Sequence, residues 1–162
     1  GNFSHSKKDM RKIMYEVDYG SFNLYGGGLE AIDQPYSKQQ NEANIDEMLE
    51  FAGSKYIVIQ ELGMHSDSEL LNSSEQIQVD FFRTFFTKMQ QEPRIKAAYV
   101  FQLVDWSPAT IDLLNSLYEP GTPQTFIDQY GQILATIGLM DYNTGTRRPA
   151  FAEFIYWAEK FK

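Results

Sequence analysis

The stretch "KYIVIQELG", residues 55–63, decides the fold of this 162-residue chain. Its apolar, β-branched run at 56–59 is typical of a strand buried on both faces of a parallel sheet. The run continues directly into Glu61, and Gly63 follows two residues later. The stretch therefore predicts a central strand that holds a carboxylate at its carboxyl end.

Helices and strands are predicted to alternate on both sides of this strand. Two more strands are expected, one over 17–28 and one over 97–106. Three glycines at 26–28 interrupt the first of them. Apolar residues at helical spacing and capping serines predict the helices, over 5–15, 37–52, 73–91 and 108–117 and from Pro149 onward. The resulting order α-β-α-β-α-β-α predicts an α/β fold with about three parallel strands, covered by helices on both faces.

Composition and charge exclude several classes of function. Hydrophobic residues make up 43% and charged residues 22%, as expected for a single globular domain spanning 1–162. A net charge of −8 argues against nucleic acid as a partner, and no apolar run is long enough to span a membrane. Cysteine is absent and the two histidines lie sixty residues apart, so no metal site is predicted. No cofactor motif is present, because "GGGLE" matches neither a phosphate loop nor a dinucleotide fingerprint.

Polar and aromatic side chains follow each predicted strand at its carboxyl end. Asn23 and Tyr25 close the first strand, Glu61 the second, and Asp105 and Trp106 the third. Loops that follow parallel strands meet at one edge of the sheet, and binding sites form there. The sequence therefore predicts that these five side chains share one face of the molecule.

Each of these residues also has a structural interpretation. Glu61 is equally well explained as an acid in an ion pair or a loop cap, and Trp106 as a core residue. Tyr25 could anchor the glycine turn, and His65 could be a polar loop residue that contacts no substrate. In "DYNTGT", residues 141–146, an Asx turn at Asp141 is favoured over a calcium ligand.

The order of these motifs resembles the C-terminal part of a retaining (β/α)8-barrel (TIM-barrel) glycoside hydrolase. The clan concerned carries its catalytic carboxylates after the fourth and seventh strands. "VDYGSFNLYGG" (17–27) is similar to the clan's sixth strand, "KYIVIQELG" (55–63) to its seventh, and "AAYVFQLVDW" (97–106) to its eighth. "IGLMDYNTGTRRPAFAEF" (137–154) is similar to the "GL…D…G…KP" segment before the last helix, with arginine in place of lysine.

The resemblance implies a role for each candidate residue. Glu61 would be the nucleophile of a double displacement, Tyr25 its hydrogen-bonding neighbour, and Trp106 the platform on which a sugar ring stacks. Contacts to sugar hydroxyls are implied for Asn23, His65 and Asp105. The substrate would be a polysaccharide or oligosaccharide, no cofactor is implied, and a secreted or periplasmic location follows from that substrate.

The chain departs from the family in having three predicted strands, where a complete barrel has eight. The fourth-strand general acid/base has no counterpart, since Glu16 and Glu30 lie in the wrong places. Three barrel strands would also leave two edges unpaired. We therefore expect the chain to need a missing N-terminal barrel half, or a self-associated copy, and to be inactive alone. The alternatives are a non-catalytic α/β module that binds carbohydrate or protein, or a barrel that has lost its upstream acid and only binds sugars.

Overall fold

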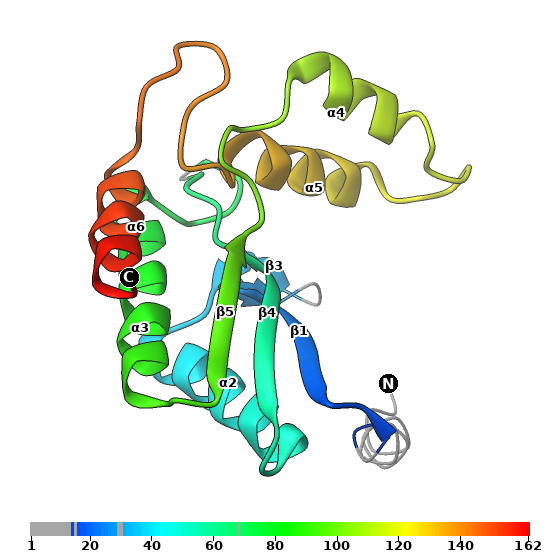
Figure 1. The fold of residues 1–162 in the computed structure, drawn as a ribbon. Coiled ribbons are helices and arrows are strands. Elements are labelled where there is room, and N and C mark those ends of the chain that lie inside the picture. The colour runs from blue at the N-terminus through cyan, green and yellow to red at the C-terminus, as the bar shows by residue number, and fades with distance from the viewer. Residues whose placement is uncertain (1–13, 15, 29–30, 68) are drawn as a thin grey trace.

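The fold is α/β and is built on a three-stranded parallel sheet (Figure 1). A computed structural model describes residues 14, 16–28, 31–67 and 69–162. The first expected helix, over 5–15, lies almost entirely outside the described residues. The strands are β1 (Tyr19–Tyr25), β4 (Tyr56–Gly63) and β5 (Ile95–Val100), in the order β1-β4-β5. The predicted central strand is confirmed as β4, which pairs in parallel with both neighbours.

Three helices cover one face of this sheet: α2 (Lys38–Ala52), α3 (Glu75–Gln91) and α6 (Pro149–Lys160). Ser37 caps α2 through a capping box with Gln40, because each side chain bonds the other's backbone N–H. Gly53 ends the helix with a φ of 61°, a conformation that favours glycine. All three helices were expected from the sequence, and their boundaries agree to within about two residues.

The hydrophobic core lies between the sheet and these helices. Ile57, Ile59 and Leu62 of β4 are fully buried, and Phe82 and Phe85 of α3 pack against them within the same cluster. On α6, the inward aromatic residue is Trp157, which is 5% exposed and stacks on Phe86. Ile155 lies on the outer side of the same helix, where it is 40% exposed.

The described helices leave the other face of the sheet open, so the prediction of helices on both faces is wrong for this part of the chain. The tyrosines Tyr19, Tyr56 and Tyr99 are each more than half exposed, one on each strand. The two remaining helices, α4 (Pro108–Asn115) and α5 (Gln124–Thr136), pack against each other beyond the carboxyl ends of the strands (Figure 1). They therefore border the edge where a site is expected instead of covering the sheet.

Three other features differ from the sequence prediction. The third strand ends at Val100, not Trp106, because β4 ends at Gly63 and offers no further partner beyond the bond from Phe101 N to Leu62 O. The chain forms a short antiparallel pair of β2 (Gly27–Gly28) and β3 (Ala31–Pro35), and neither β3 nor α5 was predicted. None of the helices described is both long and apolar enough for a membrane span.

Candidate functional site

Glu61 lies at the carboxyl end of β4, where two side chains of β1 reach it. A bulge between Phe22 and Asn23 shifts the register, so that Asn23 pairs with Glu61 across the sheet. Oε2 of Glu61 accepts hydrogen bonds from Nδ2 of Asn23, at 2.8 Å, and from the hydroxyl of Tyr25. Among the described residues, none bonds the other carboxylate oxygen, Oε1. The carboxylate is thus held by one oxygen and leaves the other available.

The hydroxyl of Tyr25 keeps its proton and so remains a hydrogen-bond donor to this carboxylate. Burial raises the pKa of its hydroxyl strongly, and the hydrogen bond to Glu61 raises it further. The phenol therefore stays protonated at any physiological pH. Its ring meets the ring of Phe101 edge to face, with centroids 5.6 Å apart. Phe101 directly follows β5, so contributions from all three strands meet at this point.

A cavity of about 280 Å³ opens beside Glu61. One wall comes from the ends of β1 and β4 and another from Tyr130 and the last turn of α5. Gly63 lets these walls approach, because a Cβ atom there would lie 2.9 Å from Cδ1 of Ile137 and 3.1 Å from the Tyr25 ring. The lining is mostly apolar, and its described residues are Tyr25, Gly26, Gly27, Glu61, Gly63, Met64, His65, Phe101, Tyr130, Ile133, Leu134 and Ile137. Such a lining suits a ligand held by a few placed polar groups.

His65 lines this cavity, and its imidazole ring has no hydrogen-bond partner in the described part of the chain. Its side chain is only 5% exposed, and neither Nδ1 nor Nε2 is bonded. Burial lowers the pKa of the imidazole to about 4, and the negative charge of Asp67 opposes this shift only in part. Near neutral pH the ring is therefore uncharged, with one nitrogen able to donate and the other to accept.

Asp105 does not reach this cavity. Its carboxylate is buried in an ion pair with Arg148, in which Nη1 lies 2.9 Å from Oδ1 and Nη2 lies 2.6 Å from Oδ2. Oδ1 also accepts the backbone N–H of Gly138 at 2.8 Å. Its hydrogen bonds among the described residues thus all go to protein groups, and the sugar contact expected for Asp105 stays a prediction that the Glu61 cavity does not support.

Trp106 lies on a different cavity from Glu61. With Asp105 it lines a more open hollow of about 440 Å³, bounded by α4, α5 and residues 141–143. The chain beyond β5 turns away from the sheet, which separates Trp106 from the strand ends. The structure therefore brings together four of the six candidate residues, Asn23, Tyr25, Glu61 and His65, and places Asp105 and Trp106 elsewhere.

The residues that sequence reasoning missed come from α5 and from the end of β5. Phe101 contributes the aromatic ring at the end of β5, and Tyr130, Ile133 and Leu134 form the α5 wall. The sequence carries a signal for α5, because Phe126, Tyr130, Ile133 and Ile137 recur at helical spacing.

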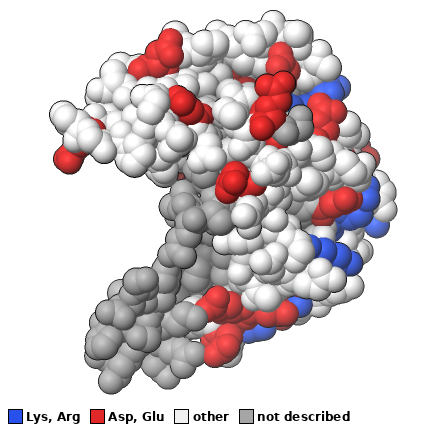
Figure 2. Space-filling model, turned by 180° about the vertical axis from the view of Figure 1, so that it is seen from behind, with Lys and Arg blue, Asp and Glu red and all other residues white. Residues whose placement is uncertain are grey.

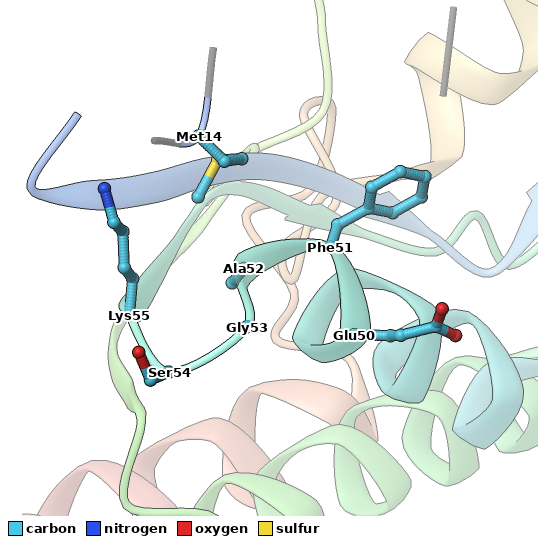
Figure 3. A pocket seen from close by; sticks show the side chains of 7 residues that line it. All are labelled: Met14, Glu50, Phe51, Ala52, Gly53, Ser54 and Lys55. Carbon is cyan, nitrogen blue, oxygen red and sulfur yellow. The ribbon is translucent and has the colours of Figure 1, made fainter. Parts of the chain in front are cut away.

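A further hollow, of about 470 Å³, lies at the opposite end of the sheet (Figure 3). It surrounds the turn between α2 and β4 and is lined by Met14 and residues 50–55. In parallel α/β proteins, sites form at the carboxyl ends of strands, so the Glu61 cavity is the stronger candidate.

In the described part of the chain, no three His, Asp or Glu side chains are placed to hold a metal ion. At Asp141, the predicted Asx turn is confirmed, because the carboxylate accepts the backbone N–H of Asn143, two residues on, as well as that of Thr144.

No family model matches this chain, and no curated protein matches it. In structure it is similar to a beta-glucuronidase from Faecalibacterium prausnitzii, with a TM-score of 0.56 over 98% of this chain and 16% identity. It is also similar to a GH2 beta-galacturonidase from Eisenbergiella tayi, solved with galacturonate bound, with a TM-score of 0.51 over 88% of this chain and 11% identity. The chain spans 24% of the length of each. Its α/β fold is related to that of glycosidases.

Proposed function

We propose that this chain is the C-terminal part of a (β/α)8-barrel glycoside hydrolase that acts on a polysaccharide or oligosaccharide with retention. The observation that supports it is the arrangement around Glu61: a carboxylate at a strand end, held through one oxygen by Asn23 and Tyr25, with a cavity beside it. A nucleophile needs this combination of fixed orientation and a free oxygen.

In this mechanism Oε1 of Glu61 attacks the anomeric carbon as the bond to the leaving oxygen breaks, and a glycosyl ester forms on Glu61. Asn23 and Tyr25 keep the carboxylate in the attacking orientation, and Tyr25 stays protonated throughout. Water then attacks the same carbon and releases Glu61 as the free carboxylate.

The leaving group needs a second, protonated carboxyl group about 5–5.5 Å from the nucleophile. Glu61 is the only carboxylate among the described residues that line the cavity. We therefore place the general acid on a partner surface, the N-terminal part of the barrel, which also covers the open face of the sheet. The chain alone would not turn over substrate.

The same lone carboxylate favours one alternative, a module that binds carbohydrate without cleaving it. The two functions separate at Glu61→Gln in the native-length protein that contains this chain. For a glycosidase, turnover of a panel of nitrophenyl glycosides falls by on the order of 10⁴- to 10⁶-fold, while the unfolding midpoint stays close to wild type. The matched control is Glu119→Gln, which alters an exposed glutamate that does not line the cavity. Turnover that survives Glu61→Gln would refute the catalytic role.

A further inference from the structure

The Glu61 cavity contains a buried group whose partner is absent from the described protein. The imidazole of His65 is 95% enclosed, yet neither of its nitrogens has a hydrogen-bond partner among the described residues. Buried polar atoms in folded proteins are almost always bonded. His65 lines the same cavity as Glu61 and Tyr25, so a molecule that fills this cavity lies within its reach.

The hairpin leaves room next to this ring. Gly27 of β2 lines the cavity, and a Cβ atom placed on it would lie 3.9 Å from Nε2 of His65. Glycine adds no side chain there, so no side chain of residue 27 covers this side of the ring, and Nε2 is enclosed without a hydrogen-bond partner among the described residues. A neutral imidazole in such a position can accept from, or donate to, a hydroxyl group.

The described lining of this cavity carries no positive charge. The sequence has no Lys or Arg in 16–28, 31–37, 56–67, 69–82 or 97–146, the described segments that hold the strand ends and the residues following them. Figure 2 shows Asp and Glu but no Lys or Arg side chains on the surface formed by α4 and α5. Arg148, which is buried and lies just after the last of these segments, is already bonded to Asp105.

Positive charge is what a protein uses to hold a carboxylate ligand, with arginine the best suited because it binds both oxygens at once. The cavity offers the opposite: the acid Glu61, the neutral ring of His65 and apolar walls. A uronic acid would bring its own negative charge next to Glu61, and no described residue of the lining is a cation that could balance it. A sugar with a hydroxymethyl group would bring only hydrogen-bonding hydroxyls.

We infer that the Glu61 cavity binds a neutral sugar ring, with His65 hydrogen-bonded to one of its hydroxyls, and that it rejects uronic acids. This specificity differs from that named for the two structural neighbours, a glucuronidase and a galacturonidase. The inference rests on the proposed carbohydrate site, but not on Glu61 being catalytic.

The test uses the fact that the chain has only two histidines, His5 and His65. In the native-length protein, labelled with ¹⁵N-histidine, a His65→Gln variant identifies the ring signals of His65 by difference, and a His5→Gln variant identifies those of His5. The probes are methyl glycosides of the gluco, galacto and manno series, both anomers, each paired with the corresponding methyl uronide. The two members of a pair differ only at C6.

We expect the neutral member of at least one pair to move the His65 signals at a concentration about 10-fold or more below that of its uronide. His65→Ala should weaken the binding of that neutral glycoside by up to about 10-fold, the usual worth of one neutral hydrogen bond. A uronide that binds as well as or better than its neutral partner would overturn the inference. So would His65 signals that no probe moves.

Failure of this inference can be told apart from failure of the proposed function. Neutral sugars that move His65 without any turnover would leave the specificity intact and indicate the binding module. Turnover that Glu61→Gln abolishes, combined with a preference for uronides, would leave the glycosidase intact and refute the specificity.

Discussion

Two groups of polar side chains lie beyond the carboxyl ends of the strands, and they differ in how completely the protein satisfies them. Around Asp105, both carboxylate oxygens are bonded, and Arg148 also donates to the carbonyl of Gly138 at 2.8 Å. Around Glu61, one carboxylate oxygen and both nitrogens of His65 have no partner in the part of the chain described. The first group is complete, and the second is open toward a cavity.

The difference separates residues that hold the backbone around the cavity in place from residues that face the cavity itself. Gly138 packs so closely on Asp105 that an added Cβ would lie 2.4 Å from its backbone nitrogen. The Asp105–Arg148 pair thus fixes the turn that follows α5, next to Ile137 in the cavity wall. A closed network of this kind stabilises the protein, whereas the unbonded ring of His65, which lines the cavity, has hydrogen-bonding capacity left for a molecule bound there.

The largest effect expected on stability comes from breaking the closed group. Arg148→Met should lower the free energy of unfolding by about 3–5 kcal/mol, because it leaves the Asp105 carboxylate buried and unpaired. Urea denaturation would measure this loss. The control is Arg147→Met at the neighbouring position, which is exposed and stacks on Phe151, with an expected cost of about 1 kcal/mol or less. Equal costs for the two variants would contradict the structural role of the pair.

The open group should make stability depend on pH through His65. Its pKa is about 4 in the folded protein and 6.5 in the unfolded chain, so the unfolded state binds more protons between these values. The contribution is complete above pH 6.5 and is lost as pH falls toward 4. At about 1.4 kcal/mol for each pH unit of this window, the loss reaches about 3 kcal/mol.

Urea denaturation at a series of pH values would measure this loss, with His65→Gln as the variant that cannot titrate. Its curve should be flatter than that of wild type between pH 6.5 and 4, and the curve of His5→Gln should retain the wild-type slope. Asp67 does not interfere, because its own pKa is lowered and it loses its contribution at more acidic pH. Parallel curves for wild type and His65→Gln would show that His65 is not buried as a neutral ring.

Tyr25→Phe tests how much the hydrogen bond from Tyr25 to the Glu61 carboxylate contributes to activity. It removes one donor from Oε2 of Glu61 and keeps the ring that packs on Phe101. A hydrogen bond to a charged group is worth about 1.5–3 kcal/mol, so kcat/KM should fall by roughly 10- to 100-fold. Tyr156→Phe, on α6 and 51% exposed, should leave kcat/KM unchanged. A similar fall in both variants would point to a general effect on the fold.

The smallest effect distinguishes the two aromatic residues that follow β5. Phe101 lines the Glu61 cavity and Trp106 lines the other hollow. Phe101→Ala should therefore raise KM by about 3- to 10-fold, through the loss of one aromatic contact, while Trp106→Ala leaves KM unchanged. The reverse pattern would restore Trp106 as the stacking platform that the sequence motif implied.

The sequence predicted well those features that depend on local patterns. The buried run at 56–59, the serine caps at Ser37 and Ser74 and the proline at Pro149 all gave elements that the structure contains. The meeting of Asn23, Tyr25 and Glu61 followed from the general geometry of parallel strands.

The missed features depend on long-range packing. A buried partner 43 residues away, Arg148, decides that Asp105 is structural, and the end of β4 decides where β5 stops. The wall formed by α5 follows from how that helix packs beyond the strands. No local pattern around Asp105 or Trp106 carries this information.

The most direct test of the central claim is to trap the glycosyl ester on Glu61. The native-length protein would be incubated with 2-deoxy-2-fluoroglycosyl fluorides of the series it turns over, then digested with trypsin and analysed by tandem mass spectrometry. The account predicts one added fluoroglycosyl group on the peptide spanning residues 56–83, at Glu61, and none in the Glu61→Gln variant. Turnover with no adduct, or an adduct on another carboxylate, would contradict it.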